Sequence, residues 1–229
     1  MIKKNKDQLE IKKTGDGSRT LYVPALGESY HSHFGAVNES LHVFVKAGFN
    51  FISGKRKHIR LLEIGLGTGL NALLTYFEAE KKNIKVRYTG LEPDPLDPIL
   101  VSKLDYPGFI GYSGAYSIFD LIHAAKWEIL TPISDKFDLV KSCSELENFF
   151  PGRQRFDLVY FDAFSPSVQP ELWTLAVFEK ISKASDPGCT LVTYSSKGQV
   201  RRNMERAGFK VERLPGPEGK REMLRAVKQ

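Results

Sequence analysis

The sequence predicts an α/β fold with a mostly parallel, doubly wound sheet and an antiparallel hairpin at its carboxyl-terminal end. Short apolar runs alternate with segments of helical spacing along the chain, as expected for successive β–α units. The run at residues 156–161, FDLVYF, is typical of a parallel strand covered on both faces. Two further runs, at 209–214 and 223–227, flank a loop rich in glycine and proline and predict the closing antiparallel pair.

The expected elements follow one another in a simple order. A short strand at the start and a helix at 39–47 precede the first strand of the main sheet, and the other elements alternate after it. The segment 106–117 contains three glycines and is expected to be a loop. Strands are predicted at 20–24, 59–64, 85–92, 137–141, 156–161 and 189–195, and later helices from 70 onward and at 99–104, 118–127, 144–149, 170–184 and 199–207.

Length and composition favour one domain in a reducing compartment. The chain has 229 residues, of which 41% are apolar, enough for one substantial core. We expect a polar amino-terminal arm at 1–18 and a domain at 19–229. Its two cysteines lack metal-ligand spacing, and no apolar run is long enough to span a bilayer. The predicted location is the cytoplasm, without membrane association.

The turn GLGTG at 65–69 follows the apolar run at 59–64 and precedes a helical segment. Such a turn lets a backbone approach a ligand and aims a helix amino terminus at it. Its spacing is G-x-G-x-G; the dinucleotide fingerprint would need a third glycine where Leu70 stands. With acidic residues before the turn and at the next strand end, the pattern favours S-adenosylmethionine, a nucleoside without a pyrophosphate. The predicted cofactor-binding residues are Glu63, Gly65, Gly67, Gly69, Asn71, Glu92, Ser142 and Asp162.

Asp162 is the most informative polar residue because it ends an otherwise apolar strand. A carboxylate there is costly unless it faces a cleft or has a partner. In open parallel sheets, ligands bind outside the carboxyl ends of the strands, so the segment DAFSP at 162–166 is expected at the edge of the cofactor. Asp162 is the predicted catalytic residue; a helix or loop cap is the alternative.

Basic residues raise the formal net charge to +6 and gather in four clusters, near 3–13, 55–60, 197–210 and 220–225. Clusters that share one face could follow a phosphate backbone. His31 and His33 could suggest a metal, but no third ligand is close in the sequence, so no metal is expected.

The chain resembles the methyltransferase domain of the MnmC family, which completes 5-methylaminomethyl-(2-thio)uridine at the tRNA wobble position. The resemblance extends from residue 20 to 227. It rests on YHSHFGAVNESLHVF (30–44), LEIGLGTGLN (62–71), FDAFSPSVQPELW (161–173), GCTLVTYSSKGQVRR (188–202) and GPEGKREML (216–224). The second, flavin-dependent oxidase domain of that family is not found here, so a stand-alone methyltransferase is expected. Ser142-Cys143-Ser144 replaces the acidic residue that many class I methyltransferases place near the adenine.

The resemblance implies a class I methyltransferase fold and N-methylation of the aminomethyl group of 5-aminomethyl-(2-thio)uridine, with the anticodon loop of tRNA as partner. It places Asp162 beside the substrate amine. The predicted substrate-binding residues are Tyr30, Glu39, His42, Phe164, Arg201, Arg202, Lys220 and Arg221, with Trp173 as a further stacking candidate. The main alternative is a class I N-methyltransferase acting on a small-molecule or protein amine. A non-catalytic nucleic-acid-binding protein and an aminopropyl transferase are less consistent with the glycine turn and the few carboxylates.

Overall fold

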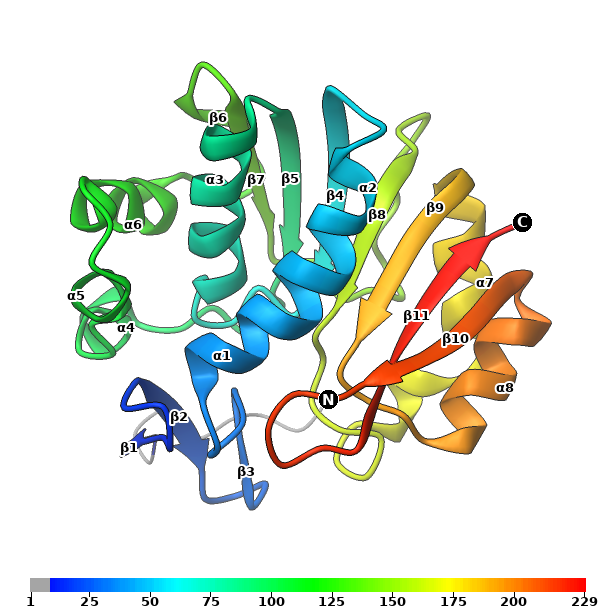
Figure 1. The fold of residues 1–229 in the computed structure, drawn as a ribbon, viewed down its shortest axis with the longest axis horizontal. Helices are drawn as coiled ribbons and strands as arrows, with labels where there is room; N and C mark the ends of the chain where they lie inside the picture. Colours follow the sequence, from blue (N-terminus) through cyan, green and yellow to red (C-terminus); the bar gives the residue numbers. More distant parts are fainter. Residues whose placement is uncertain (1–8) are drawn as a thin grey trace.

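The structure is a computed structural model that describes residues 9–229. Its main sheet has eight strands in the order β10-β11-β9-β8-β4-β5-β7-β6 (Figure 1). Five neighbouring strands are parallel, and β11 and β6 run antiparallel to their neighbours β9 and β7. The strands are β4 (His58–Ile64), β5 (Lys85–Leu91), β6 (Thr131–Ser134), β7 (Phe137–Ser142), β8 (Phe156–Phe161), β9 (Ser185–Thr193), β10 (Phe209–Pro215) and β11 (Glu222–Lys228).

Helices cover both faces of this sheet (Figure 1). One face carries α1 (Ala36–Ser40), η2 (Leu41–Phe49, with π-helical hydrogen bonding) and α2 (Asn50–Ser53), which follow one another without a break, together with α3 (Leu70–Lys82). The other face carries α7 (Leu175–Ala184) and α8 (Gly198–Arg206). Shorter helices complete the fold: α4 (Pro98–Ser102), α5 (Tyr106–Ile110), α6 (Ala115–Ala124) and the 3₁₀ turn η3 (Pro170–Trp173).

The alternation of side chains along β4 explains why both faces need a cover. Ile59 and Leu61 lie in the core beneath η2 and α3, whereas Leu62 and Ile64 lie in the core beneath α7 and α8. Gly48 of η2 allows the helix to approach closely, because a Cβ there would come within 2.9 Å of the Val192 side chain. The central strands are therefore buried on both sides, and only their ends reach a cavity.

A second, three-stranded sheet lies at the carboxyl-end side of the main sheet (Figure 1). It consists of β1 (Glu10–Lys13), β2 (Arg19–Val23) and β3 (Glu28–Ser29), all antiparallel. Leu21 and Val23 of β2 are buried, which anchors this sheet to the domain. The predicted boundary at residue 18 thus falls inside a hairpin, and residues 1–8 of the predicted arm lie outside the described part of the chain.

The structure agrees with the predicted order of elements in the main sheet, and β1 and β3 of the small sheet were not predicted as strands. Three further short segments differ. Residues 106–110, expected to be in a loop, form α5, where Pro107 occupies the first turn and needs no helical hydrogen bond. The predicted helix at 144–149 is only a turn around Glu145, which accepts the Phe149 N–H at 2.9 Å. The short edge strand β6 was not predicted, because its TPIS sequence includes a proline. Within residues 9–229, no helix is both long and apolar enough to cross a membrane.

Candidate active site

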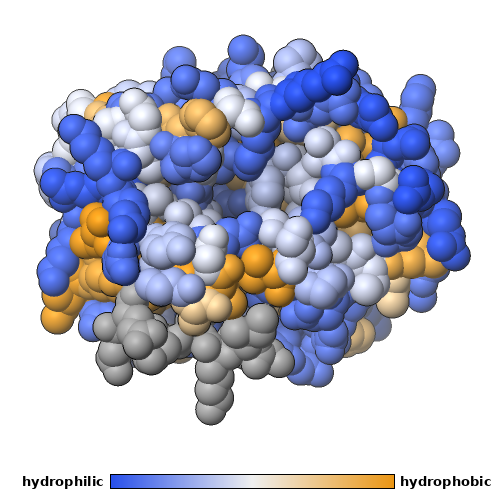
Figure 2. Space-filling model, turned by 90° about the horizontal axis from the view of Figure 1, so that it is seen from below, coloured by the Kyte–Doolittle hydropathy of each residue, from blue (hydrophilic) through white to orange (hydrophobic). Residues whose placement is uncertain are grey.

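A cavity of about 800 Å³ opens at the carboxyl ends of β4, β5 and β8. The strand order switches direction here, because β5 lies on one side of β4 and β8 on the other. Open α/β sheets bind ligands at such a switch point. The small β1–β3 sheet, the start of α1 and the loop between β10 and β11 provide the remaining walls. Figure 2 views the molecule from below, at this end of the sheet, where hydrophilic residues cover most of the face.

The glycine turn after β4 forms part of the cavity floor. Gly65 has φ 88°, and a Cβ on it would collide with the carbonyl oxygen of Asp162. Gly67 has φ 51°, and a Cβ on it would come within 3.1 Å of the Tyr30 ring. Both positions therefore require glycine, for the backbone conformation and for the close approach of neighbouring segments.

Glu92 follows β5 and fixes the shape of this turn. Its carboxylate accepts the Gly67 N–H at 3.0 Å and the Asp94 N–H at 3.2 Å. The side chain lines the cavity although the residue is only 3% exposed. A carboxylate has more acceptor sites than these two hydrogen bonds use, so Glu92 can also accept hydrogen bonds from ribose hydroxyls.

Asp162 lies across the cavity floor in a cluster of acidic groups. Its Oδ2 accepts a hydrogen bond at 2.8 Å from the Asn71 side-chain nitrogen, which also donates to Glu63 Oε1 at 2.8 Å. The Tyr88 hydroxyl donates to the other oxygen of Glu63 at 2.7 Å. Glu63 is completely buried and does not line the cavity, whereas Asp162 does. Asn71 on α3 therefore holds Asp162 against a carboxyl group behind the cavity.

Burial and mutual repulsion shift the proton affinities of these acids. Burial, followed by the charge of Glu39, raises the pKa of Asp162 to about 8, despite the Asn71 hydrogen bond. Burial raises the pKa of Glu63 well above its usual range, and the nearby Asp162 charge adds to this. The pKa of Glu63 thus lies well above its usual range, and Asp162 can gain or lose a proton near neutrality.

A buried ion pair forms the wall opposite the glycine turn. Glu39 on α1 is 5% exposed; its Oε1 accepts the Ser32 N–H at 2.9 Å and its Oε2 accepts Lys220 Nζ at 2.5 Å. The Lys220 ammonium also lies 3.9 Å from the centre of the Tyr194 ring. Lys220 belongs to the loop between β10 and β11, and the adjacent Gly219 sits so close to Phe34 that a Cβ would collide with its ring.

Aromatic and hydroxyl groups complete the cavity walls. The rings of Tyr30 and Phe164 meet edge to face, with centroids 5.1 Å apart. The Trp173 indole N–H donates to the Phe164 carbonyl at 2.9 Å. This hydrogen bond helps to fix the position of the DAFSP loop. His31 Nε2 lies 2.9 Å from Thr68 Oγ1, and burial lowers the pKa of His31 to about 4, so the ring is neutral.

The structure gathers about half of the predicted site residues around the cavity. Those that line it are Gly65, Gly67, Glu92, Asp162, Tyr30, Glu39, Phe164 and Lys220. Glu63, Gly69, Asn71 and Ser142 lie behind the lining residues, where Asn71 orients Asp162, Ser142 bonds Ser144 of the wall and Gly69 starts α3. His42 Nε2 donates to the Pro215 carbonyl oxygen at 2.8 Å, and Arg201, Arg202 and Arg221 lie outside the lining.

Several lining residues were not identified from the sequence. Lys12 and Lys13 come from β1, a strand that was not predicted, and Tyr22 comes from the predicted strand at 20–24, where no motif marks it as a site residue. Glu28 accepts the Ser165 N–H at 3.2 Å and ties the small sheet to the DAFSP loop. Tyr194 directly follows β9, so the rule that ligands bind beyond the carboxyl ends of strands could have identified it.

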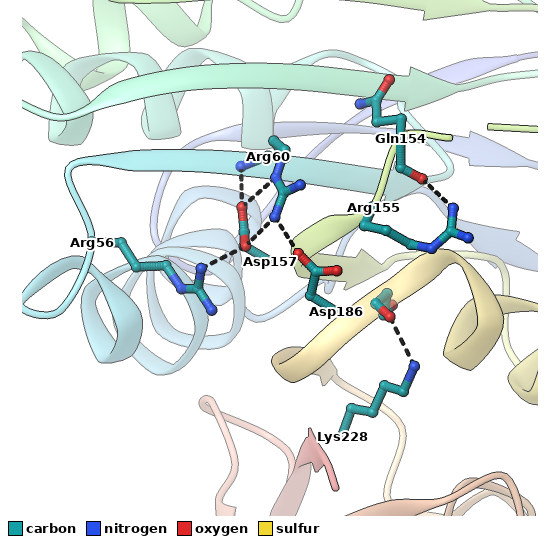
Figure 3. A network of polar contacts seen from close by, with 8 residues as sticks. Arg56, Arg60, Gln154, Arg155, Asp157, Asp186 and Lys228 are labelled. Atoms are coloured by element: carbon teal, nitrogen blue, oxygen red, sulfur yellow. Dashed lines mark hydrogen bonds and ion pairs between the residues drawn. The ribbon is translucent and has the colours of Figure 1, made fainter. Parts of the chain in front are cut away.

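The basic cluster at 55–60 lies at the opposite end of the sheet and does not share the face of the cavity. Arg60 binds Asp157 through its side chain and its backbone N–H, Arg56 adds a contact at 2.7 Å, and Arg60 also reaches Asp186 (Figure 3). Because Asp157 is 2% exposed, this network compensates a buried charge near the amino ends of β4 and β8.

The residues of the cavity fit a nucleoside with an amino-acid tail. The volume lies in the range of small-molecule sites, the glycine turn leaves room for a close approach, and Glu92 offers an acceptor for a ribose diol. Among the described residues, no cluster of three or more His, Cys, Asp or Glu side chains could hold a metal ion. The chemistry available here is that of carboxylates, an ammonium and aromatic rings.

Comparisons with known proteins define the class. The sequence profile of a family described as S-adenosyl-L-methionine-dependent methyltransferase matches residues 134–229. The mostly parallel sheet and the glycine turn after β4 agree with this match. The chain has the fold of a class I methyltransferase, and its carboxyl-terminal part is similar to methyltransferases that use S-adenosyl-L-methionine.

Within this class the protein is MnmC-like. It is 29% identical to the "tRNA 5-methylaminomethyl-2-thiouridine biosynthesis bifunctional protein MnmC" of Burkholderia thailandensis over 90% of this chain, and 29% identical to that of Aromatoleum aromaticum over 96%. The chain spans about a third of the length of these relatives, 33% and 35%. The crystal structure of MnmC2 from Aquifex aeolicus superposes with a TM-score of 0.76 at 26% identity, covering 96% of this chain and 70% of that one.

Proposed function

We propose that the protein methylates the primary amine of 5-aminomethyl-(2-thio)uridine at the tRNA wobble position, giving 5-methylaminomethyl-(2-thio)uridine. The observation that carries this proposal is the continuity of the cavity, which joins the cofactor turn at Gly67 to the carboxylates Asp162 and Glu39. An amine bound there meets hydrogen-bond acceptors beside the cofactor. The names of the MnmC relatives, which refer to tRNA 5-methylaminomethyl-2-thiouridine biosynthesis, support this choice of amine.

For the cofactor, we assign direct contacts to Gly65, Gly67 and Glu92 and indirect roles to the groups behind them. S-adenosyl-L-methionine, when bound, supplies a methyl group carried on a sulfonium. Glu92 accepts the ribose hydroxyls while it holds the turn in shape. Asn71 and the buried Glu63 support the position of Asp162.

Asp162 orients the substrate amine and receives its proton. Alkyl ammonium groups titrate near pH 10, so most of the free substrate is protonated and has no lone pair for attack. A carboxylate with a pKa of about 8 can accept the proton of the amine through a hydrogen bond as the new N–C bond forms. Orienting the amine in line with the methyl group contributes more to the rate than the basicity of Asp162, because Asn71 fixes the position of the Asp162 carboxylate.

We place the RNA backbone over the small sheet and the loops around the cavity mouth. Lys12 and Lys13 of the exposed strand β1 line the cavity and can contact phosphates, together with Arg221, Arg201 and Arg202; Lys12 and Arg201 would exchange their ion pairs with Glu10 and Glu205 for these contacts. Lys220 serves a different purpose, because it is paired with Glu39 inside the cavity. The base of the target nucleotide leaves the anticodon loop and meets the Tyr30 and Phe164 rings.

The decisive experiment is methylation of defined RNA with labelled cofactor. Two anticodon stem-loops of the same sequence are compared, one with 5-aminomethyluridine and one with 5-methyluridine at the wobble position. We expect label only in the aminomethyl RNA, and a rate that falls steeply between low and moderate salt. Equal labelling of free alkylamines, or a rate insensitive to salt, would favour a small-molecule or protein amine as substrate.

A further inference from the structure

The ammonium of Lys220 occupies a cavity wall that also holds two carboxylates, Glu39 and Asp162. It contacts Glu39 Oε2 at 2.5 Å and is not bonded to Asp162. Lys220 thus pairs with Glu39 and leaves Asp162, the carboxylate beside the cofactor turn, without this cation as a partner. The pairing is not a loose surface contact, because the Glu39 side chain is only 7% exposed.

Three contacts fix Lys220 in this place. The Tyr194 ring lies 3.9 Å beneath the ammonium, a cation–π arrangement. The loop is closed by hydrogen bonds from the Gly216 N–H to the Arg221 carbonyl and from the Lys220 N–H to the Pro217 carbonyl. Gly219 lies against Phe34 with no space for a side chain. The backbone of the loop therefore holds Lys220 pointing inward.

The charge state of an amine bound in this cavity depends on the combined charge of Lys220, Glu39 and Asp162. Two unpaired carboxylates would hold the amine as an ammonium, whose nitrogen has no lone pair. One carboxylate with a cation nearby favours loss of that proton. The other ionisable side chains that line the cavity are the lysines Lys12 and Lys13, the acids Glu28, Glu92, Asp94, Glu145, Glu147 and Glu171, the neutral His31 with His33, and the tyrosines Tyr22, Tyr30 and Tyr194.

We propose that Lys220 neutralises Glu39 and repels the protonated substrate, so that the amine meets Asp162 alone and is held in its neutral, nucleophilic form. Lys220 thus acts as a positioning residue through its charge, which shapes the electrostatic field around the amine, and it makes no bond to the transferred methyl group. This inference rests on the amine substrate proposed above. The charge relation between Lys220 and Asp162 agrees with it, since Lys220 lowers the pKa of Asp162 while Glu39 raises it.

The first test is the pH dependence of turnover with the aminomethyl stem-loop at saturating RNA. In Lys220→Gln we expect the acid limb of the kcat profile to move up by about one pH unit, since an unshielded charge at this range perturbs a neighbouring group by that order. At pH 7 this corresponds to a loss of about tenfold in kcat with KM unchanged or lower. Lys220→Arg should keep the wild-type limb.

The double variant Lys220→Gln/Glu39→Gln separates charge from structure. It restores the net charge of the pair, so its acid limb should return to the wild-type position even if its overall rate is lower. Lys183→Gln, which removes an exposed lysine on α7, is the control for net charge. A Lys220→Gln limb that stays in place, or a double variant no better than the single one, would overturn the proposal.

A binding measurement gives a second readout that does not depend on turnover. The affinities of the aminomethyl and methyl stem-loops are compared at pH 7. In Lys220→Gln the preference for the aminomethyl RNA should rise about tenfold, because the ammonium then gains a second carboxylate. If Lys220→Gln instead bound the aminomethyl RNA more tightly and turned it over faster at every pH, Lys220 would be a competitor of the substrate amine for its site, and the proposal would be overturned. Lys220→Met serves if Lys220→Gln does not fold. Failure of the wild-type protein to methylate either RNA rejects the proposed function itself.

Discussion

Strand β8 carries an aspartate at each end, and the two have opposite environments. Burial alone would raise the pKa of Asp157, but hydrogen bonds from Arg60 and the charge of Arg56 outweigh it and leave the pKa lowered. Asp162, five residues later, has an amide as its partner and a second carboxylate nearby, and its pKa rises to about 8. The structure thus stabilises the charged form of Asp157 at one end of β8 and destabilises the charged form of Asp162 at the other end.

The difference shows what each end of the sheet contributes. At the amino ends of β4 and β8, arginines satisfy the buried Asp157, so the network stabilises the fold and leaves nothing for a ligand. At the carboxyl ends, Asp162 has an amide and not a cation as its hydrogen-bond partner, which costs stability and provides a group that can exchange a proton. Substitutions at the two ends should therefore separate activity from stability.

The largest effect is expected from Asp162→Asn. The amide keeps the size of the side chain but cannot accept the proton of the amine. We expect kcat to fall by about 100-fold or more, within the range typical of general acid–base groups. Cofactor affinity, measured by calorimetry, should change by less than about threefold. Full turnover in this variant would remove Asp162 from the reaction.

Asp157→Asn should have the reverse profile. The loss of the carboxylate leaves Arg60 and Arg56 without a counter-charge, and we expect the free energy of unfolding to fall by about 2 kcal/mol, reduced because both arginines are partly exposed. Urea denaturation measures this change. Activity per folded molecule should be unchanged; Asp186→Asn, at the exposed end of the network, is a milder control.

Glu92→Gln tests the cofactor site without altering the acid cluster. The amide retains one acceptor oxygen but loses charge-assisted hydrogen bonds to the ribose and to the Gly67 N–H. We expect affinity for S-adenosyl-L-methionine to fall by about tenfold, or about 1.4 kcal/mol. The effect should be as large for the demethylated cofactor product. A loss confined to turnover would mean that Glu92 does not bind the ribose.

The smallest expected effect is a pH dependence of stability. The folded pKa of Asp162 lies above its unfolded value, so the folded state binds more protons between the two values, and the contribution of Asp162 to stability is lost as pH rises toward 8. The unfolding free energy of Asp162→Asn relative to wild type should therefore increase by about 1 kcal/mol between pH 7 and pH 8. A flat difference would indicate that Asp162 ionises normally.

Much of the fold and part of the site could be predicted because their determinants are local. The glycine turn, Glu92 and Asp162 follow from the rule that ligands bind beyond strand ends, which needs only the order of strands. The pairing of Glu39 with Lys220 could not be predicted, because the two residues are 181 positions apart and belong to different layers of the molecule. Glu63 was assigned to the cofactor from its position before the turn; its contacts with Tyr88 and Asn71 depend on side-chain direction, which the sequence does not show.

The walls of the cavity come from nearly every part of the chain, from Lys12 in the first described strand to Lys220 before the last. During synthesis on the ribosome, the central strands emerge long before the loop that contains Lys220. A nascent chain can therefore build most of its sheet without yet retaining a ligand. Cofactor capture is expected to be a late event in the folding of this domain, and it would stabilise only chains in which the loop between β10 and β11 has already been made.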